Sequence, residues 1–96
     1  MITEVNVKLP KDPASRVLAT AELMLEDGIV IHDLKVIEGR NGLFVAMPSR
    51  LGNDGVFRDV VHPTTRAARK KLDDLVLHEY RRMNRERRSQ AVHPAE

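Results

Sequence analysis

The stretch NGLFVAMPSR, residues 41–50, decides the expected fold of this chain. Five consecutive apolar residues, 43–47, lie between Asn-Gly and Pro-Ser, which are strong turn signals. A strand with one solvent-facing side alternates apolar and polar residues, and this strand does not. The pattern is typical of a strand that is covered on both faces, so it predicts a central strand of a sheet, with Phe44 in the core.

Further strands are predicted on both sides of this stretch. Residues 2–9 and 16–25 carry apolar residues at alternate positions, residues 29–37 are rich in β-branched residues, and residues 56–61 form a shorter apolar run. Short connections, such as residues 26–28, favour antiparallel pairing of neighbouring strands. The expected sheet is therefore antiparallel and has about five strands.

From residue 64 onward the apolar period becomes that of a helix. A single stripe repeats at helical spacing, and it consists of Ala68, Leu72, Leu75, Val76, Tyr80 and Met83. Pro63 ends the preceding strand, and Thr64 or Thr65 is suited to cap the start of the helix. The predicted helix runs to about Arg88, which makes it roughly 24 residues and about 36 Å long.

Together these patterns predict an α+β fold, an antiparallel sheet followed by one long C-terminal helix. Residues 1–88 are expected to form a single domain, and residues 89–96, which have no apolar pattern, are expected to be a disordered tail. One helix covers only one face of such a sheet. A second copy of the chain would cover the other face, so a homodimer is predicted. The alternative is a small sheet that leaves one apolar face partly exposed.

The composition is that of a globular protein, with 42% apolar and 31% charged residues in a chain of 96. There is no cysteine, which excludes disulfides and thiolate metal sites. The first residues have neither the basic nor the apolar region of a secretory signal, and no apolar run approaches the roughly 18 residues of a membrane span. A cytoplasmic protein without a membrane partner is therefore expected.

Candidate catalytic residues are scattered along the chain. The four histidines show no metal-ligand spacing, and His32 and Asp33 are neighbours in a predicted strand, so their side chains should point to opposite faces. None of the serines lies in a nucleophile turn, and the glycines build neither a phosphate loop nor a dinucleotide fingerprint. The chain is therefore not expected to be an enzyme or to bind a cofactor, a metal or a small-molecule substrate.

Charge is distributed unevenly along the chain. Residues 1–65 carry seven Lys and Arg against nine Asp and Glu, a net −2, whereas residues 66–96 carry nine against five, a net +4. Four of these cations fall in the first two turns of the predicted helix, namely Arg66, Arg69, Lys70 and Lys71. The helix dipole already makes this end positive, so cations there favour the binding of an external anion such as phosphate. The alternative is an ordinary solvated face.

Three segments resemble the stage V sporulation protein G (SpoVG) family of bacteria: VIHDLKVIEGRNGLFVAMPSR (30–50), DGVFRDVVHP (54–63) and LVLHEY (75–80). The resemblance extends over residues 3–83. It implies an antiparallel sheet with a C-terminal helix and a dimer joined through strands. It also implies site-selective binding of DNA, and of RNA, by a regulator associated with septation and sporulation that has no enzymatic activity.

The resemblance places the nucleic-acid contacts around the helix start, which is residues 65–71 of this chain. Two of the four cations there, Arg69 and Lys71, match basic positions of the family, and the other two are additions. The target sequence is not implied, because this segment varies between members. Residues 81–96 extend past the usual end of the family, so the resemblance implies no role for them.

The sequence therefore predicts a dimeric regulator that binds DNA, and RNA as a second ligand. The residues expected to contact nucleic acid are Arg66, Arg69, Lys70, Lys71, Arg50 and Arg81. With only three aromatic residues and Phe44 expected in the core, stacking of single-stranded bases is not expected. The alternative function is a protein-interaction adaptor whose basic helix docks an acidic partner.

Overall fold

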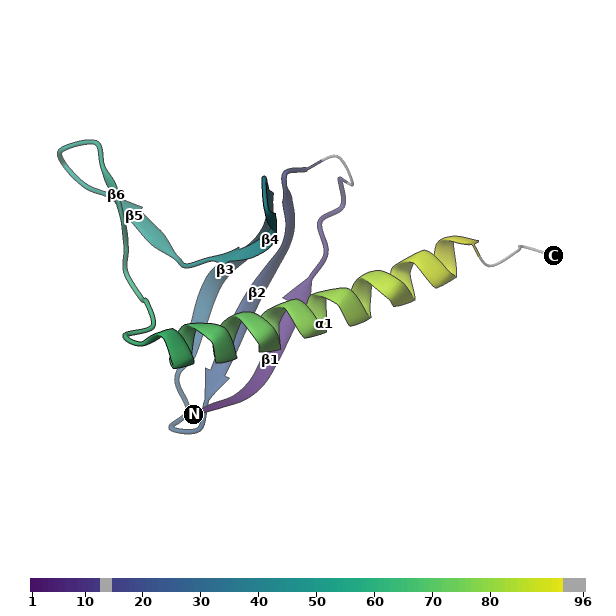
Figure 1. Ribbon diagram of the computed structural model, residues 1–96, viewed down its shortest axis with the longest axis horizontal. Coiled ribbons are helices and arrows are strands. Elements are labelled where there is room, and N and C mark those ends of the chain that lie inside the picture. The colour runs from purple at the N-terminus through teal and green to yellow at the C-terminus, as the bar shows by residue number, and fades with distance from the viewer. Residues whose placement is uncertain (13–14, 93–96) are drawn as a thin grey trace.

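The computed structural model describes residues 1–12 and 15–92. The elements are β1 (Ile2–Lys8), β2 (Val17–Leu25), β3 (Val30–Gly39), β4 (Gly42–Ala46), β5 (Ser49–Leu51), β6 (Phe57–Asp59) and α1 (Arg66–Val92). The first four strands form one antiparallel sheet in the order β1-β2-β3-β4, and β5 pairs with β6 in a separate two-stranded sheet (Figure 1). The predicted α+β fold, a sheet followed by one C-terminal helix, is confirmed.

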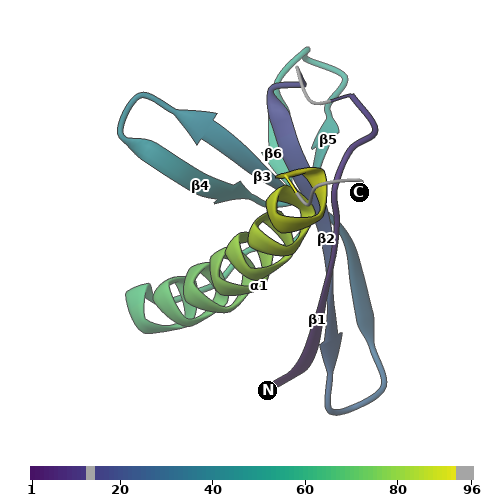
Figure 2. The same ribbon diagram turned by 90° about the vertical axis from the view of Figure 1, so that its right-hand side faces the viewer.

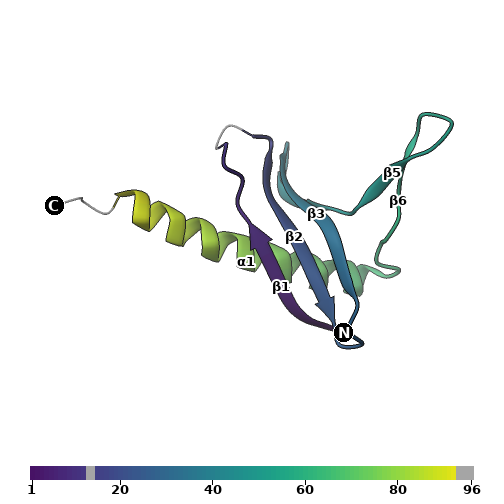
Figure 3. The same cartoon turned by 180° about the vertical axis from the view of Figure 1, so that it is seen from behind.

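Helix α1 covers one face of the four-stranded sheet. Figure 2 shows that the sheet curves around the helix, with β1 on one side and β4 on the other, and α1 contacts both strands. Alternate side chains of the strands therefore point at the helix. The largest fully buried side chains are Leu23, Leu34, Val36 and Val45 from the strands and Val76 from the helix. Figure 3 shows the opposite face of the sheet, over which no described element lies.

The helix begins where the sequence predicts and ends later. Thr65 is the N-cap, because its Oγ1 accepts a hydrogen bond of 3.0 Å from the backbone N–H of Ala68. The helix continues to Val92 instead of ending at about Arg88, so residues 89–92 are helical and not a disordered tail. The remainder of the predicted tail, residues 93–96, lies outside the described residues.

The predicted apolar stripe of the helix is confirmed in its central part. Val76 and Tyr80 are buried in the core, and Leu72 and Met83 pack against it. The other two members of the stripe, Ala68 and Leu75, are exposed. The core-facing stripe is therefore narrower than the apolar pattern of the sequence.

Strand β4 lies at an edge of the sheet, so the prediction of a central strand is wrong. Among the described residues it pairs only with β3, because the chain leaves the sheet at Pro48, which has no N–H for a ladder. Val45 is fully buried under α1, whereas Phe44 points to the opposite face and is 44% exposed. The prediction that Phe44 lies in the core is therefore wrong as well.

Residues 49–59, here called the arm, form a hairpin that projects from the body of the molecule (Figure 1). The strand predicted at residues 56–61 exists as β6, but it pairs with β5 and does not join the main sheet. Every residue of β5 and β6 is exposed, and the exposed fraction is 54% for Leu51 and 67% for Phe57, which face each other across the two strands. No part of the described chain covers these apolar side chains. Because an isolated pair of short strands has little stability, the arm lacks the packing that would normally hold such a hairpin.

Candidate nucleic-acid interface

The start of α1 presents cations to solvent without acids in the first turn. Arg66 and Lys71 are exposed, and neither forms an ion pair within the described part of the chain. The Nζ of Lys70 lies 2.9 Å from Oδ2 of Asp74, one turn later, and the side chain of Lys70 is 78% exposed. The hydrogen bond to Asp74 raises the pKa of Lys70 above its ordinary value of 10.5. The helix start therefore offers positive charge to an external anion.

Arg69 differs from its three neighbours because its guanidinium group is used within the chain. Its Nη2 donates a hydrogen bond of 2.6 Å to the carbonyl oxygen of Val45, and its Nε donates one of 3.1 Å to Oδ2 of Asp73. The side chain is 38% exposed. Arg69 thus links the first turns of α1 to strand β4, and its guanidinium group is engaged within the chain.

The arm carries two further arginines, one on each of its strands. Arg50 of β5 lies directly opposite Arg58 of β6. Sequence reasoning singled out Arg50 and missed Arg58, because the strand pairing that places them together was not predicted. Arg58 is held by Asp54 through two hydrogen bonds, 3.2 Å from Nη1 to Oδ1 and 2.6 Å from Nη2 to Oδ2. This ion pair offsets the repulsion between two like charges on opposite strands.

The ion pair predicts a pH effect confined to the arm. The hydrogen bond from Arg58 lowers the pKa of Asp54 below its ordinary value of 3.8. A carboxyl whose pKa is lowered by folding contributes stability that is present above the ordinary pKa and is lost as the pH falls through the lowered one. We expect the Asp54 carboxyl, followed by NMR, to titrate below 3.8 in the native chain and to return toward 3.8 in Arg58→Gln. Identical titrations in the two proteins would contradict this.

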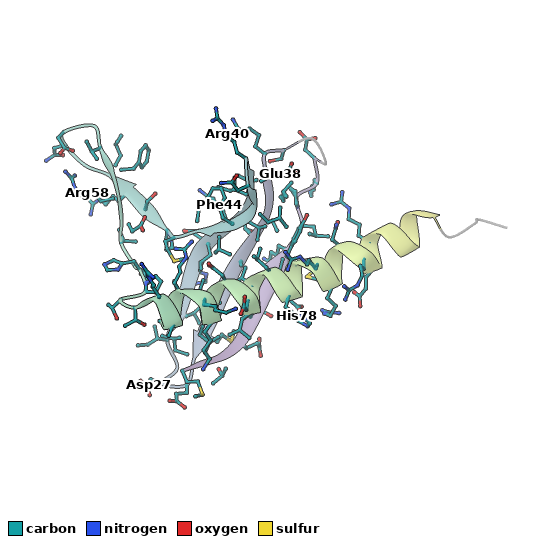
Figure 4. The ribbon with its side chains drawn as sticks, in the orientation of Figure 1. Asp27, Glu38, Arg40, Phe44, Arg58 and His78 are labelled. Carbon is teal, nitrogen blue, oxygen red and sulfur yellow. The ribbon has the colours of Figure 1, made fainter. Side chains whose placement is uncertain are left out.

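The helix start and the arm lie at the same end of the molecule, as Figures 1 and 4 show, where the label of Arg58 marks the arm. Arg81 lies elsewhere. It is exposed and on the same helix, but it follows Arg66 by 15 residues, which corresponds to about 22 Å along the axis. Five of the predicted residues therefore lie at the helix start and in the nearby arm, and the sixth, Arg81, lies farther along α1.

The uncovered face of the sheet carries a polar pair that sequence reasoning also missed. Nδ1 of His32 lies 2.9 Å from Oε2 of Glu22 on the neighbouring strand, and Asp33 adopts a positive φ of 67°. Within residues 1–12 and 15–92, no group of three or more His, Asp or Glu side chains is arranged to hold a metal ion. In the same part of the chain, no helix is both long enough and apolar enough to cross a membrane.

The fold and the charge distribution define a small α+β domain with one exposed basic helix start and an exposed arm that carries both apolar and charged side chains. The sequence model of the SpoVG family matches residues 1–82, and the chain belongs to this family. It is 49% identical to "Putative septation protein SpoVG 2" of Listeria monocytogenes serotype 4b over 71 residues, which is 74% of this chain and 70% of the relative.

Two further relatives are named "Putative septation protein SpoVG". The protein of Bacillus subtilis (strain 168) is 50% identical over 68 residues, which cover 71% of this chain and 70% of the relative. The protein of Agathobacter rectalis is 41% identical over 81 residues, which cover 83% of this chain and 91% of the relative. These names describe septation proteins, and none of them names a catalysed reaction.

Proposed function

We propose that this chain is a nucleic-acid-binding regulator that acts as a homodimer in the cytoplasm, with DNA as a ligand and RNA as a second one. The observation that carries the proposal is the helix start, where Arg66, Lys70 and Lys71 are exposed and the first turn has no acid. Phosphate is the anion that such a helix end binds most readily, because backbone N–H groups and the dipole add to the side-chain charges.

A second copy of the chain is the cover we propose for the apolar surfaces that the fold leaves open. Phe44 and Ile37 are cross-strand partners at the edge of the uncovered face. The arm adds Leu51, Val56 and Phe57, each at least half exposed. Exposed apolar side chains gathered in this way mark interaction surfaces in soluble proteins. Pairing two chains would also pair two helix starts, so that one polyanion could contact both.

The exposed aromatic residues bear on which nucleic acid is bound. Phe57 is 67% exposed and Phe44 is 44% exposed in a single chain, but the proposed second copy covers both, so the dimer is not expected to stack single-stranded bases on them. Contacts to phosphates set affinity and register but carry no sequence information. Binding should therefore be measured with random duplex pools and with random single-stranded pools.

The proposal is tested by removing charge at the helix start while keeping the helix. The triple variant Arg66→Gln, Lys70→Gln, Lys71→Gln leaves Arg69 in place, and Gln is a good helix former. We expect its affinity for duplex DNA to fall about tenfold or more, because each lost phosphate contact removes a counterion-release contribution. Fluorescence anisotropy with a labelled duplex measures the change.

A matched control keeps the same change of net charge. Lys8→Gln, Lys11→Gln, Lys35→Gln removes three exposed cations from the body of the domain. We expect its affinity to stay within about twofold of the native chain, since these residues lie outside the proposed interface. Equal losses in the two triple variants would contradict the proposal. An acidic protein that binds at high salt, where duplex DNA does not, would favour the adaptor function instead.

A further inference from the structure

The last turns of α1 extend past the sheet. Met83 is the last described residue of the helix that packs against the core, and the family match ends at residue 82. The helix nevertheless continues to Val92, and Figure 1 shows its final turns beyond β1. Residues 84–92 correspond to about 13 Å of helix without support from the sheet. We call residues 81–92, which comprise this unsupported part and the three residues before it, the overhang.

The overhang is strongly basic. It contains five arginines and one glutamate, a net +4. Arg82 is engaged by Glu79 and Glu86, at 2.7 and 2.8 Å. Arg81 and Arg85 are exposed and form no ion pair within the described part of the chain. They are spaced i, i+4, so their like charges lie side by side and disfavour the helix unless an anion joins them.

Two ordinary explanations do not account for this charge. Cations stabilise the last turn of a helix through its dipole, but the last turn of α1 contains no basic residue. A helix that lies on a membrane surface needs large apolar side chains opposite its cations. After Met83 the only apolar residues of the overhang are Ala91 and Val92. A polyanion that needs no apolar contact fits better, and nucleic acid is that class.

We infer that Arg81 and Arg85 form a second phosphate-binding surface, which rests on the proposed function and extends its footprint. Both residues lie on the outward face of α1, as does Lys70. Lys70 and Arg85 are 15 residues apart, which corresponds to about 22 Å along one straight helix. A duplex of about seven base pairs, roughly 24 Å long, is the shortest that spans from Lys70 to Arg85, whereas about 15 Å separates Lys71 from Arg81. The overhang therefore makes affinity depend on the length of the nucleic acid.

The experiment compares the native chain with Arg81→Gln, Arg85→Gln on duplexes of two lengths. For a duplex of about 24 base pairs, we expect the affinity of the variant to fall about tenfold and the dependence of log affinity on log salt to become shallower by about two units per chain. For a hairpin stem of about four base pairs, roughly 14 Å long and too short to span from Lys71 to Arg81, the two proteins should bind within about twofold of each other. Lys8→Gln, Lys11→Gln is the control with the same charge change.

Each other outcome has a definite meaning. If the overhang variant binds the long duplex as the native chain does, while the triple variant at the helix start loses binding, this inference is overturned and the proposed function stands. An equal loss on both lengths would also overturn it, because the charges would then act at a distance or through helix content, which circular dichroism reports. If the native chain binds no nucleic acid, or binds anionic vesicles more tightly than the duplex, the proposed function and this inference both fall.

Discussion

Replacing Arg69 by methionine is expected to lower the free energy of unfolding by about 2 kcal/mol, while the same change at Lys70 leaves it unaltered. Both residues lie in the first turns of α1, and both pair with an aspartate one turn later. Only Arg69 reaches the sheet, through its bond of 2.6 Å to the carbonyl oxygen of Val45. Methionine keeps the unbranched stem and the helix propensity of both side chains.

The loss of stability in Arg69→Met comes from the two oxygen atoms that would lose their hydrogen-bond donor, Oδ2 of Asp73 and the carbonyl oxygen of Val45. Asp73 is 29% exposed, and its Oδ1 is already buried without a hydrogen-bond partner among the described residues. Removing the guanidinium would take the partner of Oδ2 as well, and it would free a backbone carbonyl on an edge strand. Urea unfolding followed by circular dichroism measures the difference. Equal midpoints for Arg69→Met, Lys70→Met and the native chain would show that the contact does not hold the helix.

The second large effect concerns the assembly. We expect the native chain, of 10.9 kDa, to sediment at twice this mass at micromolar concentration, and Phe44→Ser, Phe57→Ser to sediment as a single chain. Both side chains are exposed in one chain and have no cover within its described part. A single chain would carry one helix start, so its affinity for a long duplex should fall by about a hundredfold through lost avidity.

The control for this variant is Ile29→Ser. Ile29 is 55% exposed near the turn between β2 and β3, away from both Phe44 and the arm. The Ile29→Ser variant should remain dimeric and should bind the long duplex with the affinity of the native chain. Analytical ultracentrifugation gives the masses, and a native chain that sediments at 10.9 kDa at micromolar concentration would refute the proposed assembly.

Much of the fold could be predicted from local patterns. Alternation identified β1 and β2, and helical spacing identified α1 with Thr65 as one of two candidate caps. These features depend on neighbouring residues, which is the information that periodicity carries. The extension of α1 to Val92 was missed because the residues after Met83 have no apolar stripe to signal a helix.

What failed depends on partners that are distant in sequence. The run around Phe44 is apolar on both faces, and sequence reasoning placed it at the centre of a sheet. The structure places it at an edge, because the chain after Pro48 turns away into the arm instead of returning beside β4. The position of Arg58 opposite Arg50 and the contact of Arg69 with Val45 could not be predicted either, because both depend on how separate segments of the chain come together. Composition locates charge along the chain, but only the strand pairing shows which charges are free.

The central claim, that paired helix starts neutralise phosphates, is tested most directly by the salt dependence of duplex binding. Fluorescence anisotropy of the native chain, between about 50 and 200 mM salt, gives the slope of log affinity against log salt. If the two helix starts of a dimer neutralise about six phosphates, we expect these contacts alone to give a slope of about −5, to which the contacts of the overhang add. A slope near zero, with binding that survives the higher salt, would contradict it.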